Sequence, residues 1–241
     1  MFINNLTYKV VYLGKKLRLR QLFRALREHV SGEVLDVGGW DFFTHASGDP
    51  KIIFKSWTNL EPSQEHVPDI KDSRYKLEIG DGCAMKFPNN SFDTVLNMQV
   101  VEHVFEPIKM VEEIGRVLKP GGKAIFLIPQ TAVLHHAPEH YYNFTRYWIY
   151  KALDRAGLKL VKLEPIGGRW TTFASHLVHF FFQAIRAPGY SMPENKRNVL
   201  FYLFFPFMVI YALISIPICL VFGLGDMDED PNNYVVVATK Q

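Results

Sequence analysis

Two acidic residues that each end an apolar segment are the most informative chemical groups in this sequence. Asp36 lies in the apolar run 33–37 and is followed closely by two glycines, and Glu61 closes a second apolar segment, 57–60. An apolar run of this kind predicts a buried parallel strand that delivers its carboxyl end to a ligand. The spacing to Glu61, about twenty residues, is that at which a carboxylate meets the ribose of a nucleotide-type ligand in doubly wound folds.

These groups need a sheet to position them, and the rest of the sequence shows the alternating strands and helices that would form one. Further strands are expected at 93–98, 123–128, 158–163 and 234–238. Helices are expected from Ile108 to Leu118 and around Tyr147–Ala156, the first stopped by the sequence Lys-Pro-Gly-Gly, which cannot continue a helix and turns the chain. Alternating strands and helices predict an α/β fold with a mostly parallel sheet and helices on both faces.

Length and charge favour one sizeable α/β domain with an insertion. The chain has 241 residues, 48% of them hydrophobic, and a formal net charge of +3. The positive excess is concentrated before the first acidic residue, Glu28, in a basic block made of Lys9, Lys15, Lys16, Arg18, Arg20, Arg24 and Arg27. Apolar residues interleave with this block, so a helix that covers the sheet and a helix that contacts a negatively charged membrane are equally open. No continuous apolar stretch follows the charges, which argues against a secretory signal.

Cysteine usage and the placement of charge narrow the class of protein. Cys83 and Cys219 are the two cysteines, far apart and without metal-ligand spacing. They predict a reduced protein on the cytoplasmic side, without structural disulfides or zinc. The basic residues are confined to one end and no aromatic platform accompanies them, so nucleic acid is not an expected partner.

The segment from Val199 to Gly223 does not fit an ordinary soluble domain. It carries no charged residue and is interrupted only by Pro206 and Pro217. Its length suffices to cross a bilayer, but a strand at 234–238 on the far side could not join the sheet. A proline-broken helical hairpin against one leaflet and an apolar cap on the domain are the two alternatives, and the aromatic stretch from Trp170 to Phe182 favours membrane contact.

Four motifs in order resemble those of class I S-adenosylmethionine-dependent methyltransferases. They are Val34-Leu35-Asp36-Val37-Gly38, the segment 80–93, Val101-Glu102-His103-Val104 and Arg116-Val117-Leu118-Lys119-Pro120-Gly121-Gly122. The resemblance covers roughly residues 30 to 168 and the final strand, and it implies a Rossmann-like, mostly parallel seven-stranded sheet. Segment 138–147 with Gly167-Gly168 is similar to bacterial members associated with cell-surface polysaccharide or lipid-linked substrates.

The resemblance assigns the cofactor, S-adenosylmethionine, to residues at the strand ends. Asp36 and the backbone of the two glycines would meet its methionine part, Glu61 its ribose hydroxyls, Asp81 its adenine amino group, and Asn97 would line the methyl-donor side beside Met98 and Gln99. The complete set implied for the cofactor is Asp36, Gly38, Gly39, Glu61, Asp81, Gly82, Cys83 and Asn97. Trp40 stands where the family has a further glycine, so the loop is expected to take another path or the indole to pack against the cofactor.

Histidines and aromatic residues of the segment 135–170 are candidates for the acceptor side. His136 or His140 is a possible general base for an acceptor hydroxyl, while Tyr142, Arg146 and Trp170 are candidates to shape the acceptor pocket. His135, His136 and His140 invite a metal hypothesis, but no cysteine or His-Glu-x-x-His pattern completes a site, so no metal is expected. Glu102 and His103 are expected to cap a helix or complement its dipole rather than to catalyse.

The sequence therefore predicts three regions and a leading function with one alternative. The regions are a basic amphipathic part at 1–29, a methyltransferase domain at 30–168 plus 230–241, and an apolar helical insertion at 169–229. The leading hypothesis is methyl transfer to a small-molecule or lipid-linked acceptor, such as a glycan precursor or a quinone, at the cytoplasmic face of a membrane. The alternative is a membrane-tethered binding or scaffold protein without turnover. A nicotinamide-dependent oxidoreductase is disfavoured because G-x-G-x-x-G is not present after the first strand.

Overall fold

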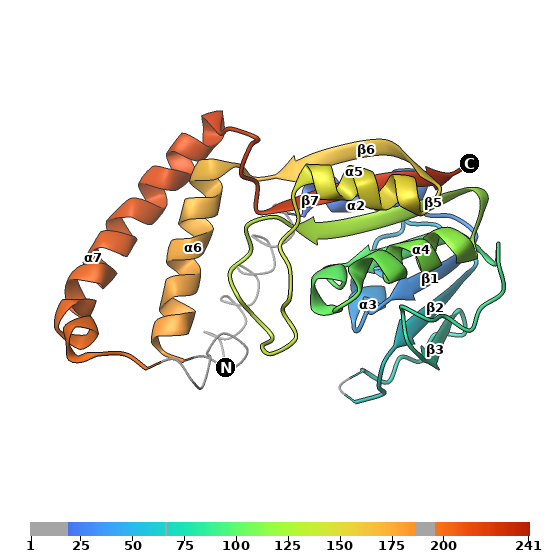
Figure 1. The fold of residues 1–241 in the computed structure, drawn as a ribbon, viewed down its shortest axis with the longest axis horizontal. Helices are drawn as coiled ribbons and strands as arrows, with labels where there is room; N and C mark the ends of the chain where they lie inside the picture. Colours follow the sequence, from blue (N-terminus) through green and yellow to red (C-terminus); the bar gives the residue numbers. More distant parts are fainter. Residues whose placement is uncertain (1–18, 66, 187–195) are drawn as a thin grey trace.

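The computed structural model describes residues 19–65, 67–186 and 196–241, so most of the basic block lies outside the described residues. A seven-stranded sheet forms its centre, in the order β3-β2-β1-β4-β5-β7-β6 (Figure 1). Its strands are β1 (Glu33–Val37), β2 (Ser56–Glu61), β3 (Tyr75–Ile79), β4 (Phe92–Met98), β5 (Leu118–Pro129), β6 (Leu158–Ile166) and β7 (Asn233–Lys240). Strands β1 to β5 pair in parallel, and β7 is antiparallel to both of its neighbours. The predicted Rossmann-like sheet is confirmed.

Helices cover both faces of the sheet. On one face, α4 (Pro107–Val117) and α5 (Arg146–Arg155) contribute buried apolar residues to one core cluster. On the other face, α2 (Arg20–His29) and the short α3 (Phe42–Ser47) pack in a second cluster around Trp57. Two 3-10 helices, η1 (Val101–His103) and η2 (Gly223–Gly225), complete the connections among the described residues.

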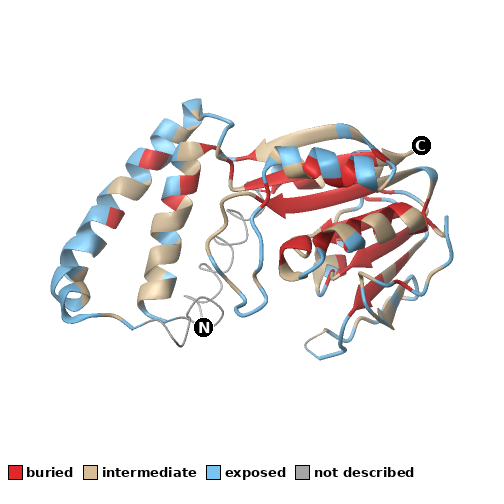
Figure 2. Cartoon of the chain, viewed as in Figure 1, coloured by how far each residue is buried: buried red, intermediate tan, exposed pale blue. Residues whose placement is uncertain are grey.

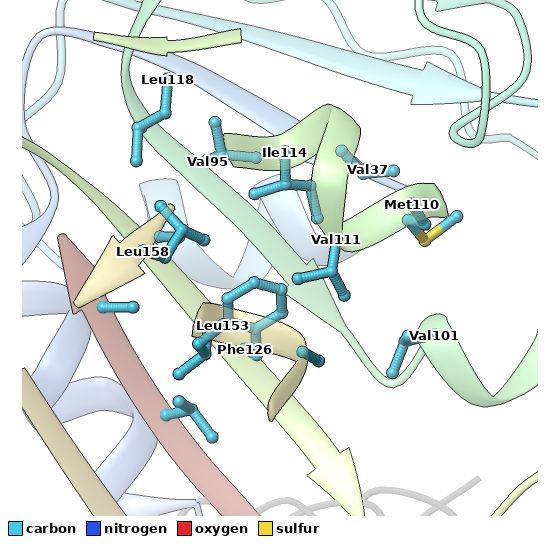
Figure 3. Packing of buried hydrophobic residues seen from close by; sticks show 14 of the residues in the cluster. Val37, Val95, Val101, Met110, Val111, Ile114, Leu118, Phe126, Leu153 and Leu158 are labelled. Atoms are coloured by element: carbon cyan, nitrogen blue, oxygen red, sulfur yellow. The ribbon is translucent and has the colours of Figure 1, made fainter. Parts of the chain in front are cut away.

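The apolar spacing of α4 shows why these helices form where they do. Met110, Val111 and Ile114 recur at helical spacing, and all three are buried against the sheet (Figure 3). Phe126 of β5 and Leu153 of α5 fill the same layer. The central strand β4 is likewise mostly buried on both sides, as expected for a parallel strand covered by helices.

The described part of the basic block packs on the sheet domain. α2 turns Leu22, Ala25 and Leu26 onto the sheet, while Arg24 pairs with Glu164 at 2.6 Å and Arg27 with Asp49 at 2.6 Å. Of the two interpretations of this helix, the one in which it covers the sheet is confirmed for residues 20–29.

A helical hairpin stands apart from the sheet between β6 and β7. It consists of α6 (Arg169–Ala184) and α7 (Val199–Phe222), which run side by side and both meet the domain near Gly168 (Figure 1). Of the residues in α7 only Ala212 and Cys219 are buried, and most of its surface is exposed (Figure 2). α7 is one continuous helix through both prolines, so the expected break within 199–223 is wrong, and so is the cap on the domain: α6 is the principal helix against which α7 packs.

Two further local expectations need correction. The predicted turn at residues 119–122 already belongs to β5, where the pairing with β4 moves from Phe92–Leu118 to Thr94–Lys123. The helix ends at Val117, before the Lys-Pro-Gly-Gly sequence, as expected. Residues 119–122 themselves lie within β5, where the pairing with β4 is irregular. β3 and α3 were not predicted, because both are short and lack a continuous apolar pattern.

Candidate functional site

The turn after β1 approaches the sheet so closely that only glycine fits. Gly38 has a φ of +72°, in the left-handed region, and its N–H donates to the Leu60 carbonyl at 2.9 Å. A Cβ on Gly39 would lie 2.0 Å from Oδ2 of Asp36, so a side chain there would displace the carboxylate. The absence of side chains at Gly38 and Gly39 therefore lets the turn pack against Asp36 and Val100, and both glycines line a cavity at the carboxyl end of β1.

Asp36 lies beneath this turn rather than on its surface. Its side chain is fully buried, and neither carboxylate oxygen has a hydrogen-bond partner among the described residues. Burial raises the pKa of Asp36 well above its usual range, and the nearby Glu61 raises it further. The Trp57 indole has a smaller opposing effect, although no hydrogen bond of normal geometry joins the two. Direct contact between Asp36 and the ammonium group of the cofactor's methionine part does not fit this burial.

The pKa of Asp36 predicts a pH-dependent stability. The folded state keeps the Asp36 proton above the ordinary pKa of 3.8, where the unfolded chain releases it. Stability from this group is thus full below about 3.8 and falls as pH rises toward the folded pKa, by up to about 1.4 kcal/mol per pH unit. We expect Asp36→Asn to gain stability relative to the unsubstituted protein between pH 4.5 and pH 7 in urea unfolding. A stability difference that stays constant over this range would contradict the assignment.

Glu61 ends β2 beside the glycine turn and is already engaged by it. Its Oε1 accepts the backbone N–H of Trp40 at 2.5 Å, and its side chain is 8% exposed. Burial raises the pKa of Glu61, while the hydrogen bonds of Trp40 and Asn59 act against that shift. Trp40 has a φ of +47°, the left-handed conformation that glycine adopts readily, so the tryptophan follows a glycine-like path at a cost in strain.

Asp81, Gly82 and Cys83 lie past the end of β3, next to the end of β2. Oδ1 of the exposed Asp81 accepts the Cys83 N–H at 2.7 Å, and Gly82 fits closely against Met110. No helix follows at 82–84, so Asp81 does not cap one. The three residues extend the row of strand ends that begins at β1 and β2, which is the arrangement expected of an adenine site.

Asn97 does not line an open site. It is fully buried, and its amide group faces the Val37 carbonyl at 3.5 Å and the Met110 sulfur at 3.3 Å. Its expected position on the methyl-donor side is therefore corrected: the next two residues, Met98 and Gln99, are the ones that reach the cavity wall. Met98 follows Asn97 in β4 and so points to the opposite face, whereas Gln99 lies past the end of the strand, with a φ of +58°.

A cavity of about 890 Å³ opens beside the glycine turn. Gly38, Gly39 and Trp40 form one wall, Met98 and Gln99 a second, and α2 and α6 close it with Phe23 and His179. Its volume falls in the range of small-molecule sites. The cavity thus extends from the glycine turn after β1 to His179 of α6.

Histidines gather on the wall opposite the turn. The rings of His103, His135, His136 and His140 lie with centroids 4.4 to 5.7 Å apart, and the first three line the cavity. Burial lowers the pKa of His103 to about 4, and it also lowers the pKa values of His135 and His140. These three rings are therefore neutral near pH 7 and offer lone pairs.

Glu102 does not have the helix-capping role that the sequence predicted. It lies in the three-residue η1, and no group among the described residues donates a hydrogen bond to its carboxylate, so it caps nothing. The side chain is 0% exposed, and burial raises its pKa to about 8. The sequence does place this carboxylate directly beside His103, a pair that could bind a ligand. Interpreting the two residues as the start of a helix left that pairing out.

The three residues expected to shape the acceptor pocket lie elsewhere. The Tyr142 hydroxyl donates to the Phe105 carbonyl, and Arg146 donates to the Tyr234 hydroxyl and the Asp228 carbonyl, at 3.3 and 2.6 Å. Trp170 packs edge to face with Phe222 at the base of the hairpin, with ring centroids 5.0 Å apart. None of the three lines the described cavity. Arg146 joins the start of α5 to β7 and so has a structural role.

Comparison with known proteins agrees with this geometry. A family model described as "Methyltransferase domain" matches residues 45–126. Phosphoethanolamine N-methyltransferase 2 of Caenorhabditis elegans is 38% identical over 85 residues, 35% of this chain and 18% of that protein. The chloroplastic 2-methyl-6-phytyl-1,4-hydroquinone methyltransferase of Arabidopsis thaliana is 27% identical over 158 residues, 59% of this chain and 44% of that protein. The chain thus spans less than half the length of either relative.

Solved structures share the fold. Phosphoethanolamine N-methyltransferase 2 of Haemonchus contortus, in complex with S-adenosyl-L-methionine, superposes with a TM-score of 0.56 at 18% identity, covering 93% of this chain and 52% of that chain. An S-adenosylmethionine-dependent methyltransferase from Mesorhizobium loti gives a TM-score of 0.56 at 13% identity, covering 92% and 98% of the two chains. At such identities the likeness concerns the fold.

Proposed function

We propose that this chain, a class I S-adenosylmethionine-dependent methyltransferase by fold and by domain match, transfers a methyl group to a small or lipid-linked acceptor at a membrane surface. The observation that carries the proposal is the glycine turn beside Glu61, which opens into a cavity walled on the other side by histidines. Of the residues implied for the cofactor, Gly38 and Gly39 line this cavity, and His103, His135 and His136 line it as well.

The residues at the strand ends fit S-adenosylmethionine. Gly38 and Gly39 line the cavity, so their backbone would meet the methionine part, and the carboxylate of Glu61 would accept hydrogen bonds from two ribose hydroxyls. Asp81 and the backbone near Cys83 would meet the adenine. The cofactor supplies a methyl group already activated on a sulfonium sulfur. The protein's contribution is then alignment of the acceptor and exclusion of water.

The acceptor side of the cavity offers imidazole side chains as candidate bases. His136 lines the cavity, and His140 lies behind it, where its Nδ1 accepts the His135 N–H at 3.2 Å. His136 would take the proton from an acceptor hydroxyl or amine as the methyl group arrives. The two curated relatives are named for a small phosphorylated amine and for a hydroquinone with a phytyl tail, so both acceptor classes are worth testing.

Membrane contact is proposed through the outward face of α7. Within the described ranges, α7 with its η2 extension, Val199–Gly225, is the one helix long and apolar enough to cross a bilayer. The hairpin leaves the sheet and returns to it, and the described ends of its connection carry Arg186, Lys196 and Arg197. A charged connection opposes insertion tip first, so we place α7 along the surface, on the cytoplasmic side.

A lipid-linked acceptor would reach the cavity along α6. This helix is the inner one of the hairpin, since it packs on α7 and also lines the cavity with His179. His176 binds the Thr131 carbonyl at 2.6 Å and so joins α6 to the segment that carries the histidines. A prenyl chain held in lipid beside the hairpin therefore has a short path to the site.

The alternative, a scaffold without turnover, has one observation in its favour. The Trp40 N–H already occupies Glu61, the carboxylate that the cofactor needs. Calorimetric titration of S-adenosylmethionine and of its demethylated product into the detergent-solubilised chain distinguishes the two functions. Micromolar binding supports the enzyme, and failure of a folded protein to bind either compound supports the scaffold.

Substitution of the histidines tests the acceptor side. With tritium-labelled S-adenosylmethionine, phosphoethanolamine and a total membrane-lipid extract as acceptors, we expect His136→Ala to lower kcat by about 100-fold, a typical general-base contribution. His140→Ala should have a smaller effect, since His140 supports His135 and is not on the cavity wall. Cofactor affinity should stay unchanged in both variants. Unaltered turnover in His136→Ala would remove the general base.

A further inference from the structure

We propose that Glu102, His103 and His135 bind a divalent transition-metal ion at the edge of the acceptor cavity. The ion-binding part of this inference stands on the geometry alone. The role of the ion, to hold and acidify an oxygen of the acceptor, rests on the proposed methyl transfer.

The three side chains already converge. One donor atom from each lies within 4.8 Å of the others, and His103 Nε2 is 3.8 Å from Glu102 Oε1. His103 follows Glu102 in η1, whereas His135 comes from the segment after β5, so the tertiary fold brings the set together. Ligands on an ion at about 2.0–2.2 Å lie closer than this, and a small contraction would complete the site.

The carboxylate of Glu102 is aimed into the cluster and has no other partner. It is fully buried, neither oxygen accepts a hydrogen bond, and no lysine or arginine in the described parts of the chain pairs with it. Buried carboxylates are normally hydrogen-bonded, ion-paired or bound to a metal. A cation between Glu102 and the two histidines supplies the missing partner.

Hydrogen bonds to backbone carbonyls orient both imidazoles as ligands. His103 Nδ1 lies 2.8 Å from the Glu139 carbonyl, and His135 Nδ1 lies 2.9 Å from the Val133 carbonyl. A carbonyl only accepts, so each Nδ1 carries the hydrogen and each Nε2 keeps its lone pair in the neutral ring. The same second contact, from the non-ligating nitrogen to a carbonyl, is typical of metal-binding histidines.

The donor set selects the class of ion. Two imidazole nitrogens and one carboxylate suit Zn²⁺, Co²⁺, Fe²⁺ or Mn²⁺ better than Mg²⁺, which prefers oxygen ligands and retained water. Three protein ligands leave positions open for water or an acceptor oxygen. His103 and His135 line the cavity, so these positions face the space where the acceptor would lie.

Cobalt titration of the full chain tests the site. Untagged protein is treated with chelator, dialysed and titrated with Co²⁺, with visible absorbance as readout and Zn²⁺ as competitor. We expect one equivalent to bind, and Glu102→Gln and His135→Ala each to weaken binding by at least about 100-fold. His45→Ala serves as matched control, because His45 Nε2 lies 3.6 Å from an Asp41 oxygen at the same cavity without a third ligand.

The outcomes separate this inference from the proposed function. S-adenosylmethionine binding is measured on the same samples and should survive Glu102→Gln. Cobalt binding without cofactor binding would keep the metal site and remove the methyltransferase, and the reverse would remove the metal site alone. The site is overturned if the unsubstituted protein binds no Co²⁺ or Zn²⁺, or if Glu102→Gln and His135→Ala bind as it does. Circular dichroism shows that each variant is folded, and His135→Ala, a partly exposed position, remains informative should Glu102→Gln misfold.

Discussion

Glu61→Ala is expected to lower the affinity for S-adenosylmethionine by at least about 100-fold while the sheet stays folded. The carboxylate would accept two hydrogen bonds from ribose hydroxyls, and charge-assisted bonds contribute roughly 1.5–3 kcal/mol each. Their loss corresponds to about 10² to 10⁴ in the dissociation constant. The measurement is calorimetric titration at a fixed salt concentration, with circular dichroism of the same samples.

Two companion variants identify the cause of that loss. Glu61→Gln keeps an oxygen that can accept the Trp40 N–H, so it retains the turn and should bind with intermediate affinity. Glu78→Ala removes a carboxylate of the neighbouring strand β3 that pairs with Lys76, and should bind as the unsubstituted protein does. Equal affinity in Glu61→Ala and the unsubstituted protein would exclude Glu61 from the cofactor site.

The second large effect is expected at the membrane. Leu203, Ile210 and Ile214 lie on α7 at spacings of seven and four residues, on one face, and their side chains are 55–61% exposed. Changing all three to aspartate places three charges where lipid would lie. Each charge costs up to about 2.5–3.5 kcal/mol in the apolar region and less at the interface, so vesicle binding should fall by at least about 100-fold. Co-sedimentation with vesicles of mixed zwitterionic and anionic lipids measures this.

Exposed apolar residues of the sheet domain provide the matched control. Ile53→Asp, Phe105→Asp and Val161→Asp together change the same number of exposed apolar side chains without touching the hairpin. This variant should sediment with vesicles as the unsubstituted protein does. If the α7 variant also sediments normally, or if the unsubstituted chain stays in the supernatant, α7 is not the membrane-contacting surface.

The sequence by itself determined the sheet and its ligand edge. The apolar runs of β1 and β2 end at Asp36 and Glu61, and parallel pairing puts both ends at one edge, where the register joins Val37 to Leu60. The apolar segment that forms α7 could also be predicted from the sequence, because its length and composition are properties of that segment alone. What these features share is that one continuous segment contains the whole signal.

Contacts between residues of separate segments were determined only by the tertiary structure. Tyr142, Arg146 and Trp170 are near the histidines in sequence, yet Arg146 is held by Tyr234 of β7 and Trp170 by Phe222 of α7. Asn97 faces the core because β4 alternates its side chains between two covered faces, which an apolar run does not distinguish. No local pattern specifies such contacts.

Glu102 shows the same division most clearly. Its place beside His103 is written in the sequence, but its complete burial depends on the packing of η1 against the segment after β5, which also brings His135 within reach. Periodicity reports that a segment is covered, and it does not report which distant group covers it. The chemistry at the strand ends therefore follows from the sequence, whereas the cluster of Glu102 and the histidines exists only because the folded sheet brings η1 and the segment after β5 together.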